Sequence, residues 1–200
     1  MISRLLHNLQ KRRVPKVYVS FISNILMGRC TQLRFDNFMS SWFALDNGIG
    51  QGDPLSMLLY LYYNLDALEV PKGRNEMGLG YVNDMAMVAI AKDFRQAHRR
   101  LKQMMTCTSG AIEWSSVHNS RFVTTKSTVM DFTCSRSKPC PPMVLQGVPL
   151  VPQAMHKVLG VLLDQELWWS HQASSAIAKA SKWVLAFWQL ACSVATASSW

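Results

Sequence analysis

The residues best suited to chemistry are an aspartate in a short polar turn and a glycine-rich loop that precedes it along the chain. The turn, Tyr81-Val82-Asn83-Asp84, separates two apolar runs at residues 78–81 and 85–90. A carboxylate at the tip of such a hairpin can help to hold the divalent metals that nucleotidyl transfer requires. By itself the turn is weak evidence, because Asn-Asp turns are common in loops of many functions.

The glycine-rich loop runs from Gly48 to Pro54 and opens directly into an apolar helix. Backbone N–H groups in such a loop can bind phosphate. Its glycine spacing does not match a dinucleotide fingerprint, and no Gly-Lys-Ser sequence marks a P-loop. A loop that merely needs positive backbone dihedral angles is the default interpretation, and only the turn downstream favours a functional one.

The elements that would position these residues can be predicted from apolar spacing. Two short helices interrupted at Pro15 are expected within residues 1–34. Residues 31–35 and 41–45 alternate in polarity and are predicted to pair as a hairpin. A helix over 55–70 then follows the loop. The loop would therefore lie at the start of one helix, and the polar turn at the end of the next hairpin.

Beyond the turn, four further elements are predicted: a helix from Asp93 to about His118, a strand over 122–132, a strand over 158–163 and a helix over 168–192. The predicted fold class is therefore α+β, with one α+β domain followed by a helical region. Large aromatic side chains are highly buried on average, so most of the tryptophans are expected to pack in the core or between helices. These residues are Trp42, Trp114, Trp168, Trp169, Trp183 and Trp188.

The charge of the chain bears on its partners. It contains 21 Lys and Arg against 12 Asp and Glu, which gives a formal net charge of +9. This excess favours polyanionic partners, and nucleic acid is favoured over an acidic membrane surface. Solvated basic faces are an equally weighted alternative. The hydrophobic fraction of 49% is typical of a globular chain and argues against disorder throughout.

Cysteine usage and apolar runs bear on location. The five cysteines are scattered, so reduced thiols are predicted rather than a disulfide framework. Their spacing to the histidines does not fit a zinc knuckle. No signal-peptide run is visible, and the longest apolar stretch, 55–65, is too short to span a bilayer. We therefore predict an intracellular location, the nucleus included, and no membrane partner.

In order along the chain, four segments resemble the reverse transcriptases of non-LTR, LINE-type retroelements. The loop from Gly48 to Ser56 matches that family's Gly-x-x-Gln-Gly-x-Pro-Leu-Ser segment, and the polar turn matches its aromatic-x-Asp-Asp turn. The third matching segment comprises Trp114, His118, Asn119, Ser120, Arg121, Phe122 and Lys126, and the fourth comprises Lys157, Leu159, Gly160, Val161 and Asp164. Together the four segments lie between Gly48 and Asp164, in the family's order.

The resemblance implies roles for individual residues. The implied nucleotide-binding residues are Gln51, Gly52, Tyr81 and Lys126, the implied primer-grip residues are Leu159 and Gly160, and the implied catalytic pair is Asn83 and Asp84. Asp84 would bind Mg²⁺. The implied partners are an RNA template, a DNA primer and a deoxynucleoside triphosphate.

The resemblance also implies a fold. We expect a partial polymerase palm, in which an antiparallel sheet carries helices on one face, followed by the start of a helical thumb. The expected divisions are residues 1–135 for the partial reverse-transcriptase palm, 136–165 for a connection with primer-grip-like strands, and 166–200 for the start of the thumb.

Two departures from the family pattern concern the metal site. Asn83 stands where the family has the first Asp of its pair, and an amide offers one neutral carbonyl oxygen in place of two anionic ones. The family's third carboxylate lies on a strand upstream of the basic helices, yet residues 1–34 contain no Asp or Glu. The fingers that precede that strand are also expected to be missing, so the chain is interpreted as truncated at its N-terminus.

Three interpretations follow. The chain is a remnant or fragment of an RNA-directed DNA polymerase without catalytic competence, or a non-catalytic nucleic-acid-binding module that keeps a basic groove. Alternatively, it is part of a longer protein whose fingers and third carboxylate lie upstream. Because the metal-binding carboxylates are incomplete, the chain alone is expected to show no polymerase activity.

Overall fold

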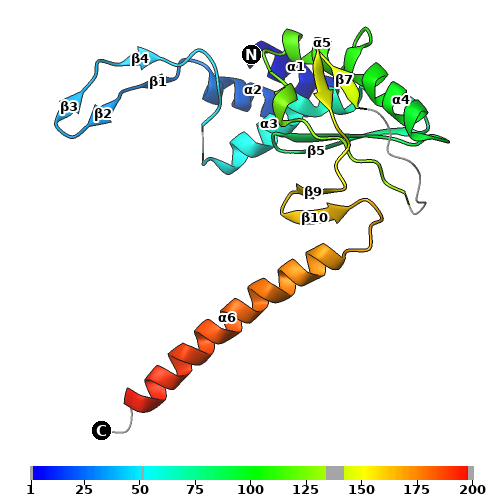
Figure 1. Ribbon diagram of the computed structural model, residues 1–200. Helices are drawn as coiled ribbons and strands as arrows, with labels where there is room; N and C mark the ends of the chain where they lie inside the picture. The colour runs from blue at the N-terminus through cyan, green and yellow to red at the C-terminus, as the bar shows by residue number, and fades with distance from the viewer. Residues whose placement is uncertain (1, 51, 134–141, 198–200) are drawn as a thin grey trace. The chain divides into compact units, whose positions relative to one another are not determined.

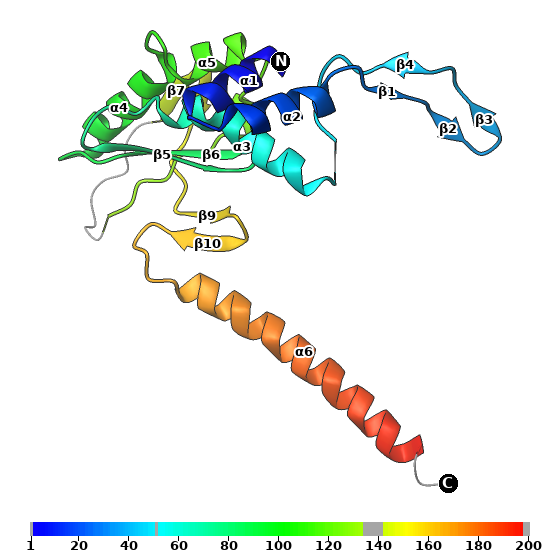
Figure 2. The ribbon, with the colours of Figure 1, turned by 180° about the vertical axis from the view of Figure 1, so that it is seen from behind.

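The chain folds into two compact units, in a computed structural model that describes residues 2–50, 52–133 and 142–197 (Figures 1 and 2). Unit 1 spans Met1–Phe122 and unit 2 spans Val123–Trp200. Both units contain helices and antiparallel strands. The predicted mixture of α and β structure is therefore confirmed.

The core of unit 1 forms where three helices meet, namely α1 (Ile2–Lys11), α2 (Lys16–Leu26) and α3 (Pro54–Leu68). The predicted break at Pro15 is confirmed, because this proline stands between α1 and α2 and caps the second helix. The apolar residues of each helix recur at helical spacing, so they form one apolar stripe along it. The helices pack together by burying these stripes against one another. The buried cluster consists of Leu5, Leu9, Val19, Ile22, Leu26, Leu59 and Tyr63.

Four charged side chains join the end of α1 to α3. Lys11 Nζ lies 2.9 Å from Asp66 Oδ1 and 3.5 Å from Glu69 Oε2, and Arg12 Nη2 lies 3.0 Å from Asp66 Oδ1. Burial raises the pKa of Asp66, but hydrogen bonds and attraction from Lys11 and Arg12 outweigh it, so the pKa lies below its usual value. Because all four side chains are partly exposed, each pair contributes about 0.2–1 kcal/mol.

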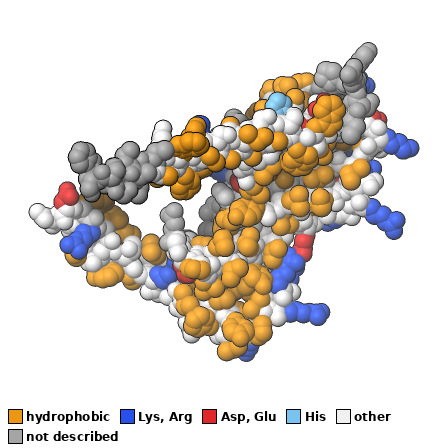
Figure 3. Space-filling model, turned by 90° about the horizontal axis from the view of Figure 1, so that it is seen from below, with side chains coloured by type: hydrophobic (Ala, Val, Ile, Leu, Met, Phe, Trp, Pro, Cys, Tyr) orange, Lys and Arg blue, Asp and Glu red, His pale blue; other side chains and the backbone are white. Residues whose placement is uncertain are grey.

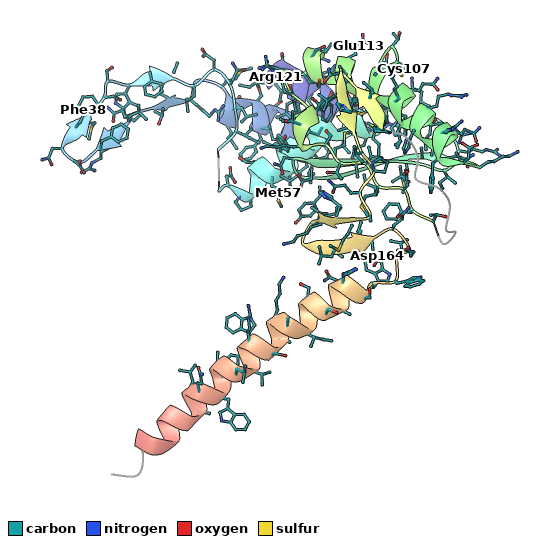
Figure 4. The ribbon with its side chains drawn as sticks, viewed as in Figure 1. Phe38, Met57, Cys107, Glu113, Arg121 and Asp164 are labelled. Carbon is teal, nitrogen blue, oxygen red and sulfur yellow. The ribbon has the colours of Figure 1, made fainter. Side chains whose placement is uncertain are left out.

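Between α2 and the glycine loop the chain forms an arm of short antiparallel pairings. Strand β1 (Cys30–Thr31) pairs with β4 (Phe43–Ala44), and β2 (Arg34–Phe35) pairs with β3 (Phe38–Met39). The predicted hairpin is confirmed. Phe38 follows the turn at the end of this arm, and its side chain is 61% exposed (Figure 4).

The hairpin of β5 (Glu76–Tyr81) and β6 (Asp84–Ala89) carries the polar turn, as predicted. Helix α3 packs on β5, and helix α4 (Phe94–Thr106) packs on β6. Both ribbon views show these two helices on the same side of the hairpin (Figures 1 and 2). Glycine permits this close packing, because a Cβ at Gly78 would lie 3.0 Å from the backbone oxygen of Leu68.

The single helix predicted from Asp93 to His118 is wrong. Helix α4 ends at Thr106, and a separate helix, α5 (Ala111–Val117), follows. The break occurs at Gly110, where an added Cβ would lie 2.7 Å from the carbonyl oxygen of Cys107. Only glycine fits such a close backbone approach, and the run of small polar residues before it favours a turn.

Unit 2 consists of short hairpins and one long helix. After the 3₁₀ turn η1 (Thr124–Lys126) come β7 (Met143–Leu145) with β8 (Val148–Leu150), then β9 (Met155–Val158) with β10 (Val161–Asp164), and then α6 (Ser170–Ala197). The helix predicted over 168–192 is confirmed. The predicted boundary at residue 135 falls outside the described residues, so it stays a prediction.

Two strand predictions in this unit are wrong. Residues 122–132 alternate in polarity but form η1 and an isolated bridge between Val129 and Pro152, rather than a regular strand. Residues 158–163 are not one strand, because Leu159 and Gly160 form the turn between β9 and β10. These two residues have φ angles of 50° and 88°, which an extended strand does not allow.

The expectation that most tryptophans are packed is wrong for the described residues. Exposed fractions reach 67% at Trp42, 77% at Trp168 and 67% at Trp183. A large aromatic is buried only where a second element covers it. Among the described residues, the arm strands pair with one another, and α6 contacts β10 within its own unit. Figure 3 shows hydrophobic side chains over much of the face that it draws.

None of the helices in the described parts of the chain combines the length and apolarity that crossing a bilayer requires.

Candidate functional site

The glycine loop leads into α3 through a capped helix start. Asp53 Oδ1 accepts a hydrogen bond from the Leu55 backbone N–H at 2.9 Å, and Pro54 occupies the first turn. Gly48 and Gly52 have φ angles of 84° and 88°, where any side chain would be strained. The local sequence therefore accounts for the course of the loop and for the position of α3.

Arg29 anchors the loop to the end of α2. Its Nη2 donates to the Gly48 carbonyl oxygen at 2.5 Å, and its Nε donates to the Leu26 carbonyl oxygen at 3.1 Å. The Arg29 backbone carbonyl in turn accepts from the Leu45 N–H at 2.7 Å. One guanidinium thus ties a helix end to the glycine loop. Sequence reasoning missed Arg29, because a lone arginine after a helix carries no signal of a distant backbone partner.

The polar turn is a two-residue hairpin loop. Tyr81 pairs with Asp84, so Val82 and Asn83 form the loop between them. Val82 has a φ of 52°, which for a β-branched residue is a genuine outlier. Asn64 Nδ2 on α3 donates to the Val82 carbonyl oxygen at 3.5 Å. A strained turn next to α3 therefore presents the exposed side chains of Asn83 and Asp84.

The residues at this turn do not fit a divalent metal pair. Asp84 supplies one carboxylate, and Asn83 supplies only a neutral carbonyl oxygen. In residues 2–50, 52–133 and 142–197, no three His, Cys, Asp or Glu side chains lie together as metal ligands. Mg²⁺ is held through carboxylates together with substrate phosphates, and two such ions need several carboxylates.

The predicted site residues are divided between the two units. Unit 1 holds Gly52, Tyr81, Asn83 and Asp84, whereas unit 2 holds Lys126, Leu159 and Gly160. Tyr81 is 61% exposed, Lys126 is exposed in η1, and Leu159 is 54% exposed in the β9–β10 turn. Gln51 lies outside the described residues. The nucleotide-binding and primer-grip roles implied by the resemblance stay predictions.

The segment from Trp114 to Phe122 serves mainly to pack α5. The ring of His118 is stacked on that of Trp114, with centroids 4.4 Å apart and an angle of 18° between planes. His118 Nδ1 donates to the Trp114 carbonyl oxygen at 2.8 Å, and Arg4 Nη1 lies 3.4 Å from Nε2. The Tyr63 hydroxyl donates to the His118 carbonyl oxygen at 2.6 Å. This histidine therefore joins α1, α3 and α5.

We expect His118 to make unit 1 less stable in mild acid. Burial lowers the pKa of His118 below its usual 6.5, and the nearby Arg4 adds to this, against the hydrogen bond to Trp114. The unfolded chain then binds the proton more readily than the folded chain does. The free energy of unfolding should be unaffected by His118 above about pH 6.5, fall below it, and level off beneath the folded pKa. Urea denaturation between about pH 5 and about pH 8 measures this.

The matched control for this prediction is the exposed His7. His118→Gln should remove the decline below about pH 6.5, whereas His7→Gln should leave it unchanged. The depressed pKa of Asp66 acts in a separate window, because its stabilisation is lost only as the pH falls below about 3.9. A decline of the same size in His118→Gln as in the wild type would contradict the assignment to His118.

Asp164, at the end of the fourth matched segment, holds the turn that precedes α6 (Figure 4). It is 6% exposed, and its Oδ1 and Oδ2 accept from the backbone N–H groups of Trp168 and Trp169 at 2.7 Å and 2.8 Å. Gln172 Oε1 accepts from the Leu162 N–H at 2.8 Å, which also joins β10 to this helix. Both carboxylate oxygens of Asp164 therefore have a structural role.

A comparison with known proteins supports the resemblance to reverse transcriptases in general, without reaching the LINE subtype. No family model matches the chain. It is similar to a probable RNA-directed DNA polymerase from transposon X-element of Drosophila melanogaster, with 28% identity over 162 residues. The match covers 80% of this chain and 17% of that protein, so the chain spans about a sixth of its relative's length. The similarity supports a relation to reverse-transcriptase-like proteins.

Proposed function

We propose that this chain corresponds to the later palm and the start of the thumb of an RNA-directed DNA polymerase from a non-LTR, LINE-type element. We also propose that the chain itself is not competent for nucleotidyl transfer. Residues 1–135 would form the partial palm, 136–165 the connection with primer-grip-like strands, and 166–200 the start of the thumb. The family's partners would be an RNA template, a DNA primer and a deoxynucleoside triphosphate.

The observation that carries the proposal is the strained turn from Tyr81 to Asp84. It lies at the end of a regular hairpin that packs on α3, the helix that the glycine loop opens. Loop, helix and turn thus come in the family's order, and the similar Drosophila protein is named as an RNA-directed DNA polymerase. A two-residue turn that keeps a valine at positive φ is not explained by hairpin formation alone, since glycine or asparagine suits that position better.

The charge at the turn supports the loss of activity. Two-metal catalysis needs carboxylates to hold both ions while they stabilise the attacking and leaving oxygens. The turn has one carboxylate where the family has two, and residues 1–34 supply none.

The DNA upstream of Met1 distinguishes a remnant from a part of a longer protein. An open reading frame with an Asp-bearing strand segment ahead of α1 would overturn the remnant interpretation in favour of the longer protein.

A second candidate function, non-catalytic nucleic-acid binding, is favoured by a basic row on α4. Arg95, Arg99 and Lys102 are all exposed and follow one another at helical spacing, so they share one side of the helix. A row of cations on one helix suits contact with successive phosphates.

We expect the chain to bind single-stranded RNA or an RNA–DNA hybrid at low salt, with affinity that falls steeply as salt rises. Replacing Arg95, Arg99 and Lys102 together by Gln should reduce the slope of log affinity against log salt by about 2 to 3, because about three phosphate contacts are lost. Fluorescence anisotropy across a salt series measures the slope.

The matched control removes three exposed cations away from α4, as Lys16→Gln, Arg34→Gln and Lys72→Gln. The net charge changes equally in the two triple variants, so a loss specific to the α4 variant identifies the row itself. Equal slopes in both variants would assign the effect to net charge, and no binding at low salt would reject this second function altogether.

A further inference from the structure

We propose that helix α6 joins two copies of this chain as an antiparallel helix pair. The helix spans Ser170–Ala197 in unit 2 (Figure 1), and the structure describes its side chains as far as Ala191. Gln172 Oε1 accepts a hydrogen bond from the Leu162 N–H at 2.8 Å, which fixes the start of the helix to β10. The proposal concerns unit 2 alone and does not depend on the polymerase function proposed above.

One side of α6 carries large apolar side chains that are each 61–67% exposed, namely Ile177, Trp183, Val184, Phe187, Trp188 and Leu190. At about 3.6 residues per turn, these six positions fall within one half of the helix circumference. The rings of Trp183 and Phe187 lie next to each other on this side, with centroids 6.1 Å apart. A contiguous apolar face that stays in water marks an interaction site.

The opposite side of α6 is mostly polar. It carries the two charged residues of the helix, Lys179 and Lys182, together with Ser175 and Gln189, and Leu185 lies among them. The apolar face is therefore free of charge, so two copies of a chain with a net charge of +9 can meet along it without opposing cations. A helix that lies on a lipid surface has a strongly charged polar face, whereas this one has two lysines.

The spacing along the apolar face is that of a helix pair. Alternating steps of three and four residues connect Ala173, Ile177, Ala180, Val184, Phe187 and Ala191. This alternation is the seam of a coiled coil, in which each seam residue inserts between residues of a facing helix. Such a seam requires a second helix with the same repeat, and a second copy of α6 has it.

The sizes of the side chains select the antiparallel direction. The first half of the face carries mainly alanine, at positions 173, 176 and 180, whereas the second half is bulky. In an antiparallel pair centred near Lys182, Ile177 lies opposite Phe187 of the second copy, and Ala180 lies opposite Val184. Small side chains then meet large ones, which fills the interface at the density of a protein interior. A parallel pair would place Phe187 against Phe187 and leave the alanine layers underpacked.

The area of the face is sufficient for a dimer. A buried aromatic side chain covers about 150–250 Å², so the exposed two thirds of Trp183, Phe187 and Trp188 amount to about 300–500 Å². Ile177, Val184 and Leu190 add about 200 Å². Each copy therefore offers about 500–700 Å², and specific interfaces bury about 600–1,000 Å² per partner.

The first test is sedimentation of the full chain over a range of concentrations. We expect a dimer of about 45 kDa that dissociates to the 22.6 kDa monomer on dilution, with a dissociation constant of about 1–10 µM. A two-fold pair is closed, so no species larger than the dimer should form through this face.

Two alanines of the same helix provide matched variants. Ala180 belongs to the seam and Ala178 lies on the opposite side, and both are exposed. Ala180→Glu should weaken dimerisation by at least about 100-fold, because each dimer then buries two carboxylates without partners. Ala178→Glu changes the net charge equally and should alter the dissociation constant by less than about twofold.

Phe187→Ala keeps the test decisive if Ala180→Glu does not fold. Phe187 is 65% exposed, so its loss should leave the monomer folded. The variant should weaken dimerisation by at least about tenfold, because the dimer loses this ring twice. Circular dichroism compares the helix content of each variant with that of the wild type.

Disulfide cross-linking tests the direction of the pair. In a chain whose five cysteines are replaced by serine, Ala173→Cys and Ala191→Cys are prepared separately and mixed under oxidation. In the antiparallel pair these positions face each other, whereas two copies of the same position are about 27 Å apart along the helix axis. We therefore expect the mixed disulfide to form in excess of either self-disulfide.

Dimerisation that is lost in Ala180→Glu, kept in Ala178→Glu and cross-linked between positions 173 and 191 supports the proposal. A wild-type chain that stays monomeric up to about 100 µM overturns it, whether the helix is then covered by unit 1 or binds anionic vesicles. Equal weakening in both glutamate variants overturns the assignment to this face. Self-disulfides in excess of the mixed one overturn the antiparallel direction.

Discussion

The 200-residue chain is expected to give no template-dependent product in primer extension on a homopolymer template, with Mg²⁺ or with Mn²⁺. In two-metal transfer, the ions stabilise the attacking and leaving oxygens and depend on carboxylates to hold them. Loss of one preorganised electrostatic group costs about 10²–10³ in rate. Under the proposed function, the 200 residues hold an Asn at position 83 and no Asp or Glu in positions 1–34, so a loss of about 10⁴–10⁶ follows if the two effects multiply. Extension of a labelled primer, resolved on a gel, measures this.

The matched variants separate metal binding from catalysis. Asn83→Asp adds a second carboxylate at the turn, so it should strengthen Mn²⁺ binding there, as seen by paramagnetic broadening of resonances near residue 84. It should still yield no product, because two carboxylates at one turn do not hold both ions. Asp84→Asn should abolish the broadening. Product from the wild type that disappears in Asp84→Asn would refute the loss of activity.

Trp114→Ala is expected to lower the free energy of unfolding of unit 1 by about 2–4 kcal/mol. Truncating a large packed aromatic costs about 3–5 kcal/mol, and the partial exposure of Trp114 reduces this. The change removes the ring stacked on His118 and the contact with Phe122, whose ring centroid lies 6.4 Å away. Urea denaturation followed by far-ultraviolet circular dichroism measures the loss.

Trp42→Ala provides the control, since Trp42 is 67% exposed on the arm and should change stability by less than about 0.5 kcal/mol. Trp114→Phe should retain part of the stabilisation, because a smaller ring can still stack on His118. Similar midpoints for Trp114→Ala and Trp42→Ala would show that the segment from Trp114 to Phe122 does not stabilise unit 1.

The parts of the fold that could be predicted are those coded by neighbouring residues. Pro15 breaks a helix because it lacks an N–H, and the glycine loop needs the positive φ angles of Gly48 and Gly52. The β5–β6 hairpin follows from two apolar runs around a polar turn. Each of these signals operates within a few residues, so no knowledge of the tertiary fold is needed to recognise them.

The parts that could not be predicted depend on partners far along the chain. Arg29 donates to Gly48, and Tyr63 donates to His118, yet neither pair is marked by local spacing. Residues 122–132 alternate like a strand, but alternation produces a strand only where a second strand pairs with it. The family resemblance includes His118 and Asp164 as motif residues. The structure shows that His118 packs on Trp114 and that Asp164 binds the backbone of the turn before α6.

The left-handed backbone at Val82 bears on how the turn can be altered. A valine held at positive φ costs about 1–3 kcal/mol, and a single-base substitution converts any valine codon to a glycine codon that relieves this cost. Such an exchange leaves Asn83 and Asp84 in place. The turn is therefore a position where the stability of the hairpin can be raised without changing its charge.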